Sequence, residues 1–343
     1  MAALALGTVQ LGEAYGRHPE LLPSAEAAVA LLLEAADPAR GVASFDTASN
    51  YGVAEERIGL AVRQLPATQP RWPEVVTKID EVADASSAAE LEEVVDRSVA
   101  LSQRRLGGVA SLDCCCIHNF GMWEAHSGAA WNRLCYHRDV LGTVGRCGVS
   151  VATFEEALTC LADPTVQHIQ LPVNLLDRRW RQLRSAEEDL GGREGSTFEE
   201  TITRAVQERG VTVHARSCFL QGTLLNDAPL WPEWAVAEGW AQRVLEPLDR
   251  LVEELGRTSR ADLCIAWVRS LPWVTHVLVG MRSLEQLRAN VRLFDNQISP
   301  PLSHAELALV EAQLPAVSER LISPWLWSDA AWAKATAAEA PKL

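Results

Sequence analysis

Short apolar runs alternate along the chain with longer stretches in which apolar residues recur at helical spacing. Short runs bounded by polar or turn-forming residues are typical of buried strands, and the longer stretches predict amphipathic helices. The predicted strands are residues 4–9, 42–45, 75–78, 114–117, 145–150, 167–171, 211–215 and 276–279. Their regular alternation with helices favours a parallel sheet, because parallel strands need a crossover connection between them.

The predicted helices are residues 25–36, 54–64, 88–105, 128–137, 153–161, 197–209, 236–255, 259–270, 284–293 and 303–314. Several begin with a good capping residue. Ser24 precedes the first helix, and Thr153 opens the fifth with two glutamates in its first turn. Eight strand–helix units in succession predict an α/β fold, namely a (β/α)8 TIM barrel closed by right-handed crossovers.

Strand and helix patterns continue through most of the chain without a linker, so residues 1–343 are predicted to form a single domain. The barrel core is expected at about residues 4–294, with a C-terminal helix and a tryptophan-rich tail at about residues 299–343. Long polar stretches follow the sixth and seventh predicted strands. Loops of this length usually carry function, so we expect them to face the substrate at the C-terminal end of the barrel.

The charge of the chain narrows the classes of partner. A formal net charge of -14 and a pI near 5.1 disfavour nucleic acid, whose phosphates need a basic face. No apolar run is long enough to span a bilayer and no signal peptide is visible, so no membrane partner is expected and the expected location is cytoplasmic. The 8 cysteines lack the paired spacing of zinc sites, so no metal is expected.

Three consecutive predicted strands end in a titratable side chain. Asp46 closes the second strand and Tyr51 lies in the loop after it, Lys78 closes the third strand, and His118 follows the fourth. The C-terminal strand ends of a barrel form its catalytic face, so these four side chains are expected to meet there. Taken singly, each has an ordinary structural explanation: a turn cap, a half-buried aromatic, a snorkelling lysine and a histidine bonded to a backbone carbonyl.

The residues around this group resemble the signature of the aldo-keto reductase superfamily. The family's Asp, Tyr, Lys and His tetrad falls on Asp46, Tyr51, Lys78 and His118 in the same order, and the likeness runs from residue 6 to about residue 294. The resemblance implies reduction of an aldehyde or ketone. Tyr51 would exchange the proton, Lys78 would lower the pKa of Tyr51, Asp46 would hold Lys78, and His118 would orient the substrate oxygen.

The same resemblance implies a nicotinamide dinucleotide, with NADP(H) favoured over NAD(H). The expected cofactor contacts are Ser150, Gln170, Arg216, Ser217, Phe219, Gly222, Gly280, Arg282, Gln286 and Asn290. Gly280 would let the backbone approach a phosphate, and Arg282 with the following helix N-terminus would bind the 2′-phosphate. Two positions depart from the family pattern: Val151 replaces an asparagine, and Arg216 replaces the aromatic residue that stacks on the nicotinamide.

The leading functional hypothesis is an NADP(H)-dependent carbonyl reductase, or an alcohol or sugar dehydrogenase in the reverse direction. Trp123, Trp231 and Trp234 are expected to wall a pocket for a small sugar-like or aromatic substrate, although tryptophans serve equally in packing. Two alternatives stay open. One is a redox-neutral lyase or epimerase that uses bound nicotinamide transiently, and the other is a nucleotide-binding regulatory subunit with little turnover. The sequence leaves the substrate, the physiological direction and the oligomeric state open.

Overall fold

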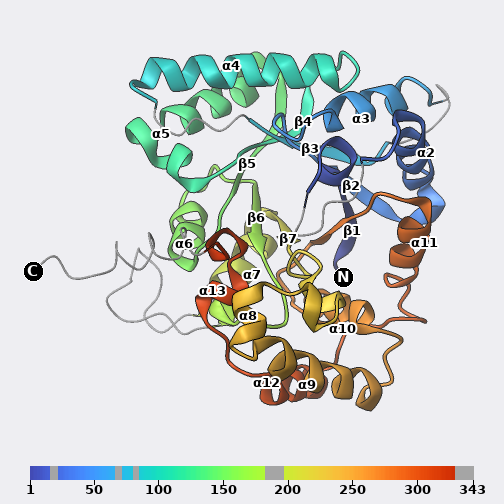
Figure 1. The fold of residues 1–343 in the computed structure, drawn as a ribbon. Helices are drawn as coiled ribbons and strands as arrows, with labels where there is room; N and C mark the ends of the chain where they lie inside the picture. The colour runs from blue at the N-terminus through green and yellow to red at the C-terminus, as the bar shows by residue number, and fades with distance from the viewer. Residues whose placement is uncertain (16–21, 66–71, 80–84, 182–196, 329–343) are drawn as a thin grey trace, which may run out of the picture.

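The computed structural model describes residues 1–15, 22–65, 72–79, 85–181 and 197–328 (Figure 1). Eight strands close into one barrel in sequence order, and every neighbouring pair is parallel, including the first with the last. The strands are β1 (Ala3–Gly7), β2 (Val42–Asp46), β3 (Glu74–Lys78), β4 (Leu112–Ile117), β5 (Val144–Ser150), β6 (His168–Pro172), β7 (Thr212–Arg216) and β8 (His276–Gly280). The predicted (β/α)8 barrel is therefore confirmed.

The helices surround the strands. They are α1 (Val9–Gly12), α2 (Ala25–Ala35), α3 (Ala54–Val62), α4 (Ala88–Arg105), α5 (Phe120–Tyr136), α6 (Phe154–Ala162), α7 (Phe198–Arg209), α8 (Glu233–Ala237), α9 (Trp240–Glu254), α10 (Arg260–Arg269), α11 (Leu284–Arg292), α12 (His304–Gln313) and α13 (Glu319–Ile322). Among the described residues, none of these helices has both the length and the apolar character needed to cross a membrane.

The expected capping residues fix the helix starts. The Ser24 hydroxyl accepts from the Ala27 backbone N–H at 3.2 Å, and Thr153 forms a reciprocal capping box with Glu156. α5 contains two helical segments, because residues 125–128 have non-helical φ/ψ angles. The segment after residue 128 agrees with the predicted helix at 128–137, and the segment that Asn119 caps was not predicted. One predicted helix is wrong. The predicted helix at 236–255 is two helices, separated at Gly239, whose φ of 75° does not continue a right-handed helix.

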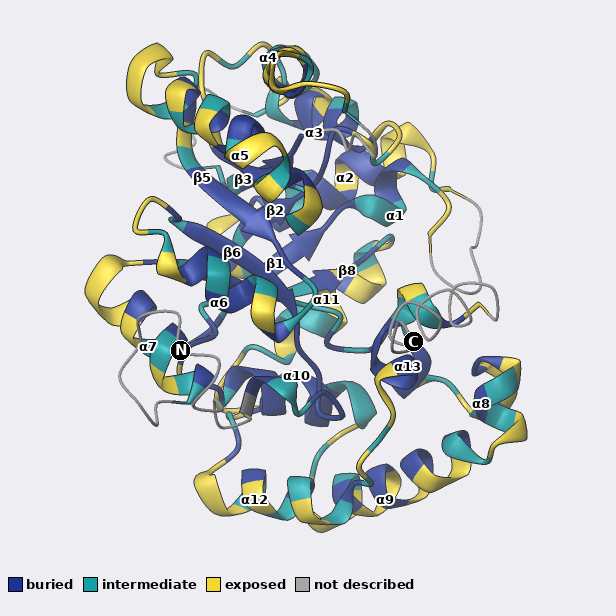
Figure 2. Ribbon diagram, turned by 90° about the vertical axis from the view of Figure 1, so that its left-hand side faces the viewer, coloured by how far each residue is buried: buried dark blue, intermediate teal, exposed yellow. Residues whose placement is uncertain are grey.

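The main hydrophobic core lies between the barrel and its helices, and Figure 2 shows the strands buried while the outer helices expose one face. The adjacent cysteines of β4 illustrate the alternation of a strand. Cys115 joins this outer core, whereas Cys114 and Cys116 pack with Val76 in a separate small cluster. All the cysteines are free thiols. Buried polar side chains at the C-terminal end of the strands include Asp46, Lys78 and Gln170, and that end holds the candidate site.

Candidate active site

Lys78 and Asp46 form a buried ion pair at the ends of the adjacent strands β3 and β2. Lys78 Nζ donates to Asp46 Oδ1 at 2.7 Å and to the Thr47 carbonyl oxygen at 2.8 Å. Both side chains are almost fully excluded from solvent. Burial alone lowers the pKa of Lys78, but the Asp46 carboxylate and the Tyr51 phenol raise it above its ordinary value. Lys78 is therefore a fixed positive charge at neutral pH.

Tyr51 and His118 lie beside this pair. Lys78 Nζ is 5.1 Å from the centroid of the Tyr51 ring, and the Tyr51 and His118 rings are 5.8 Å apart at 71°. The four residues of the expected tetrad thus converge at the C-terminal face of the barrel. Their catalytic roles stay a prediction.

Two glycines set the position of the loop that carries Tyr51. A side chain on Gly12 of α1 would collide with the Tyr51 carbonyl oxygen, and one on Gly52 would collide with the Gly12 carbonyl. Gly52 also has a φ of +52°, a conformation that side chains other than glycine rarely adopt. The close approach of these two backbones holds the phenol over the strand ends.

Burial decides the protonation state of Tyr51. It raises the pKa of the phenol above its ordinary value, and Lys78 offsets this only in part, while Asp46 adds to the rise. Lys78 does lower the pKa of Tyr51, as expected, but burial of the phenol outweighs this effect, so the expected net fall of that pKa is wrong for this structure. Tyr51 is consequently a neutral phenol at neutral pH, which is the form that can donate a proton.

His118 is also neutral. Burial, followed by the charges of Lys78 and Arg216, lowers the pKa of His118 to about 3. A neutral imidazole has one nitrogen that donates and one that accepts a hydrogen bond. His118 can therefore hydrogen-bond a ligand oxygen without adding a charge to the site.

Gln170 completes the surroundings of Asp46. Its Nε2 donates to Asp46 Oδ2 at 2.7 Å, so the two carboxylate oxygens have separate partners, Lys78 and Gln170. His214 lies next to the same oxygen, with Nδ1 at 4.0 Å. The resemblance assigned Gln170 only to the cofactor, and its contact with Asp46 was not predicted. Nothing local signals a pairing between residues on β2 and β6.

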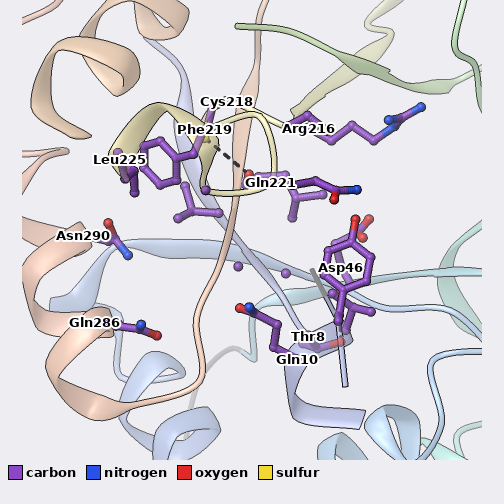
Figure 3. Close-up of a pocket in the computed structure, with 18 of the residues that line it drawn as sticks. Thr8, Gln10, Asp46, Arg216, Cys218, Phe219, Gln221, Leu225, Gln286 and Asn290 are labelled. Atoms are coloured by element: carbon purple, nitrogen blue, oxygen red, sulfur yellow. Dashed lines mark hydrogen bonds between the residues drawn. The ribbon is translucent and has the colours of Figure 1, made fainter. Parts of the chain in front are cut away.

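An elongated cavity of about 410 Å³ opens beside the tetrad, within the size range of small-molecule sites (Figure 3). Asp46 and Arg216 lie toward one end, while Gln286 and Asn290 from α11 lie toward the other. Eight of the expected cofactor residues line the cavity: Gln170, Arg216, Ser217, Phe219, Gly222, Gly280, Gln286 and Asn290. Further lining residues that were not predicted include Thr8, Val9, Gln10, Tyr15, Gln221 and Leu225.

Ser150 and Arg282 lie outside the lining of this cavity. Ser150 is buried at the end of β5, opposite Gln170 in the parallel register. Arg282 is half-buried just before α11, and its backbone N–H donates to Gln286 Oε1 at 2.9 Å. Both residues are next to lining residues, so a contact with a bound nucleotide stays a prediction.

The cavity walls suit an extended nucleotide. A Cβ on Gly280 would come within 3.1 Å of Gln10 Oε1, so glycine keeps the backbone open to a ligand at this point. The loop after β7 holds Ser217, Leu220 and Gln221 at φ values of 62°, 48° and 53°, a strained conformation that in folded proteins clusters at ligand sites. The far end offers two side-chain amides one helical turn apart on α11, and amides hydrogen-bond nucleobases well.

The three tryptophans expected at the substrate pocket do not line this cavity. Trp231 is 1% exposed and donates from Nε1 to the Asn226 carbonyl at 3.3 Å. Trp123 stacks on Phe120, with ring centroids 5.5 Å apart, and Trp234 packs under the Arg320 guanidinium at 4.2 Å. Their expected contact with a substrate stays a prediction. Within the described residues, no group of three or more His, Cys, Asp or Glu side chains is arranged to hold a metal ion.

A parallel eight-stranded barrel with titratable side chains around a cavity at its C-terminal strand ends has the architecture of a TIM-barrel enzyme. The sequence profile of the Aldo/keto reductase family matches residues 3–301. The chain therefore belongs to the aldo/keto reductase family, and family membership supports an oxidoreductase.

Solved structures share the fold. A glycerol dehydrogenase from Gluconobacter oxydans is 21% identical and matches with a TM-score of 0.64, covering 92% of this chain and 93% of its own. An aldo-keto reductase from Bacillus halodurans is 19% identical, with a TM-score of 0.63 and coverage of 93% and 95%. At this identity the likeness concerns the fold alone. A search of the curated proteins found no match.

Proposed function

We propose that this protein is an NADP(H)-dependent oxidoreductase that reduces an aldehyde or ketone to the alcohol, or runs the reverse reaction, with Tyr51 as the general acid or base. The observation that carries the proposal is the neutral phenol of Tyr51 next to the charged Lys78–Asp46 pair at the end of the cavity. Family membership supports the class of reaction. One of the similar solved structures is named a glycerol dehydrogenase, a name that denotes oxidation of an alcohol.

A nicotinamide dinucleotide held by the residues below would supply the hydride for the carbonyl carbon. Tyr51 donates its phenolic proton to the carbonyl oxygen, and Lys78 stabilises the negative charge that develops on the phenol. Asp46 keeps Lys78 in place, because one carboxylate oxygen holds the ammonium while Gln170 holds the other. The neutral imidazole of His118 donates to the same substrate oxygen and fixes its direction. A positioned general acid of this kind typically contributes about 100- to 10,000-fold in rate.

The cavity residues distribute along the nucleotide. Gln286 and Asn290 are proposed to meet the adenine, Gly280 and the loop around Ser217 the phosphates, and Arg282 a 2′-phosphate. Ser150, Gln170 and Phe219 complete the proposed set, with Ser150 and Gln170 at the nicotinamide end.

The proposal is tested by incubating the protein with NADPH or NADH and a panel of aldehydes, ketones, aldoses and keto-sugars. We expect loss of reduced-nicotinamide absorbance with formation of one alcohol per nicotinamide consumed. Substrate turnover without net nicotinamide consumption would instead identify a redox-neutral lyase or epimerase. Tight nucleotide binding without turnover of any carbonyl would favour the regulatory-subunit alternative.

A further inference from the structure

We propose that Arg216 is a receptor for a carboxylate on the substrate, so that the preferred substrates are carbonyl compounds that also carry a carboxylate a short distance from the carbonyl. This inference rests on the proposed function and adds the substrate class to it. It also gives Arg216 a different role from the stacking platform that the family usually places at this position.

Arg216 lies at the reactive end of the cavity. It is the last residue of β7, pairs in register with Pro172 of β6, and lines the cavity together with Tyr51 and Tyr15. Figure 3 shows it on the side of Asp46, away from Gln286 and Asn290. An anionic group at the adenosine end of a nucleotide would therefore lie far from this guanidinium.

The charge of Arg216 is not balanced by the protein. Within the described residues it forms no ion pair, and Nη2 donates to the Val151 carbonyl oxygen at 3.0 Å. Two carboxylates lie close enough to influence it, Asp46 and Glu156, but each is already engaged. Asp46 is held by Lys78 and Gln170, and Glu156 Oε2 accepts from the Ala152 backbone N–H at 2.6 Å in the cap of α6.

An unbalanced cation beside the reacting phenol has two effects. Its charge helps to keep His118 neutral, and burial of the guanidinium without a counter-charge is unfavourable. A guanidinium has five N–H donors, and Val151 uses only one of the nitrogens, so a planar fork remains for an anion. A substrate carboxylate fits that fork through two parallel hydrogen bonds and restores the charge balance, whereas a neutral ligand does neither.

Tyr15 adds a second polar group to the same place. Its phenol lies close enough to influence both Arg216 and Tyr51 electrostatically, and all three residues line the cavity. A carboxylate between Arg216 and Tyr15 would leave the carbonyl end of the same molecule next to Tyr51. Arg216 would thereby select the substrate and also set which atom faces the general acid.

The test compares each aldehyde acid with its own methyl ester, which has the same reacting group but no charge. The pairs are 4-carboxybenzaldehyde with methyl 4-formylbenzoate, and 4-oxobutanoate with methyl 4-oxobutanoate. The readout is the ratio of kcat/KM for acid over ester at saturating NADPH, because effects on folding or cofactor binding are common to both and cancel. We expect wild type to favour the acid at least tenfold in one pair or both.

Arg216→Met should lower that ratio at least tenfold, and Arg216→Lys should retain part of it because the charge remains while the fork is lost. Arg97→Met is the matched control, since it removes a guanidinium that is 67% exposed on α4, and it should keep the wild-type ratio. If circular dichroism shows that Arg216→Met is unfolded, the inference is decided by the wild-type ratio and by the ratio in Arg216→Lys.

A wild-type ratio below ten in both pairs, or an unchanged ratio in Arg216→Met with weaker NADPH binding, would overturn the inference and leave Arg216 as a cofactor contact. Reduction of all these aldehydes without preference would leave the proposed function intact. If wild type reduces neither acids nor esters, nor any other carbonyl, with NADPH or NADH, the proposed function itself fails.

Discussion

Replacing Lys78 by methionine removes the ammonium of the buried ion pair and keeps most of the side-chain length. Asp46 Oδ1 then loses its partner at 2.7 Å, while Oδ2 keeps the hydrogen bond from Gln170. Breaking a buried pair by removing one partner typically costs about 3–5 kcal/mol, because the remaining charge stays buried without compensation. The surviving hydrogen bond is worth about 0.5–1.5 kcal/mol, so we expect a loss near the lower end, about 3 kcal/mol.

Urea unfolding of four proteins measures this effect: wild type, Lys78→Met, Asp46→Asn/Lys78→Met, and the exposed-charge control Arg97→Met. The double variant has no orphaned carboxylate, so it should be more stable than the single variant by at least about 1 kcal/mol, within the usual range for residues in contact. The control should stay within about 0.5 kcal/mol of wild type. A double variant that is less stable than Lys78→Met would refute the ion-pair reasoning.

Three further results are expected. Because burial raises the pKa of Tyr51, the rate of reduction should stay level through neutral pH and fall only as pH rises through that raised pKa; a decline centred near pH 7 would contradict this. Burial lowers the pKa of His118 to about 3, so the stability contributed by the neutral imidazole is complete above its ordinary pKa of about 6.5 and is lost as pH falls toward 3. The free energies of unfolding of wild type and His118→Gln should therefore diverge between these two pH values. Parallel dependence on pH in the two proteins would contradict the buried, neutral state of His118. Arg282→Ala should weaken NADPH binding about tenfold with NADH little changed, by calorimetry. Arg288→Ala is its control, since Glu34 holds that guanidinium at 2.8 Å, and an unaltered nucleotide preference in Arg282→Ala would remove the phosphate assignment.

The barrel and its tetrad could be predicted because both depend on local features. Each buried strand is a short apolar run, and Asp46, Lys78 and His118 stand at the ends of such runs. Their convergence then follows from the rule that the C-terminal strand ends of a barrel share one face. The differences in the helices arose at two short segments. The Asn119-capped segment at the start of α5 was not predicted, and the left-handed Gly239 divides what otherwise reads as one amphipathic helix.

The environment of the site could not be predicted, because it depends on contacts between distant parts of the chain. Gln170 and Asp46 are 124 residues apart in sequence, and no pattern near either residue announces their hydrogen bond. Tyr15 reaches the cavity from the loop after α1. The direction in which the pKa of Tyr51 moves depends on how deeply the folded chain buries it, which the sequence of the loop does not determine.

Single-turnover hydride transfer in Tyr51→Phe tests the proposed chemistry most directly, because the change removes the phenolic oxygen and keeps the ring. Tyr136→Phe, at a tyrosine that is 40% exposed on α5, is the matched control. With any carbonyl that wild type reduces, we expect Tyr51→Phe to transfer hydride at least about 100-fold more slowly while its NADPH affinity stays within about threefold. Hydride transfer in Tyr51→Phe at the wild-type rate would contradict the assignment of Tyr51 as the proton donor.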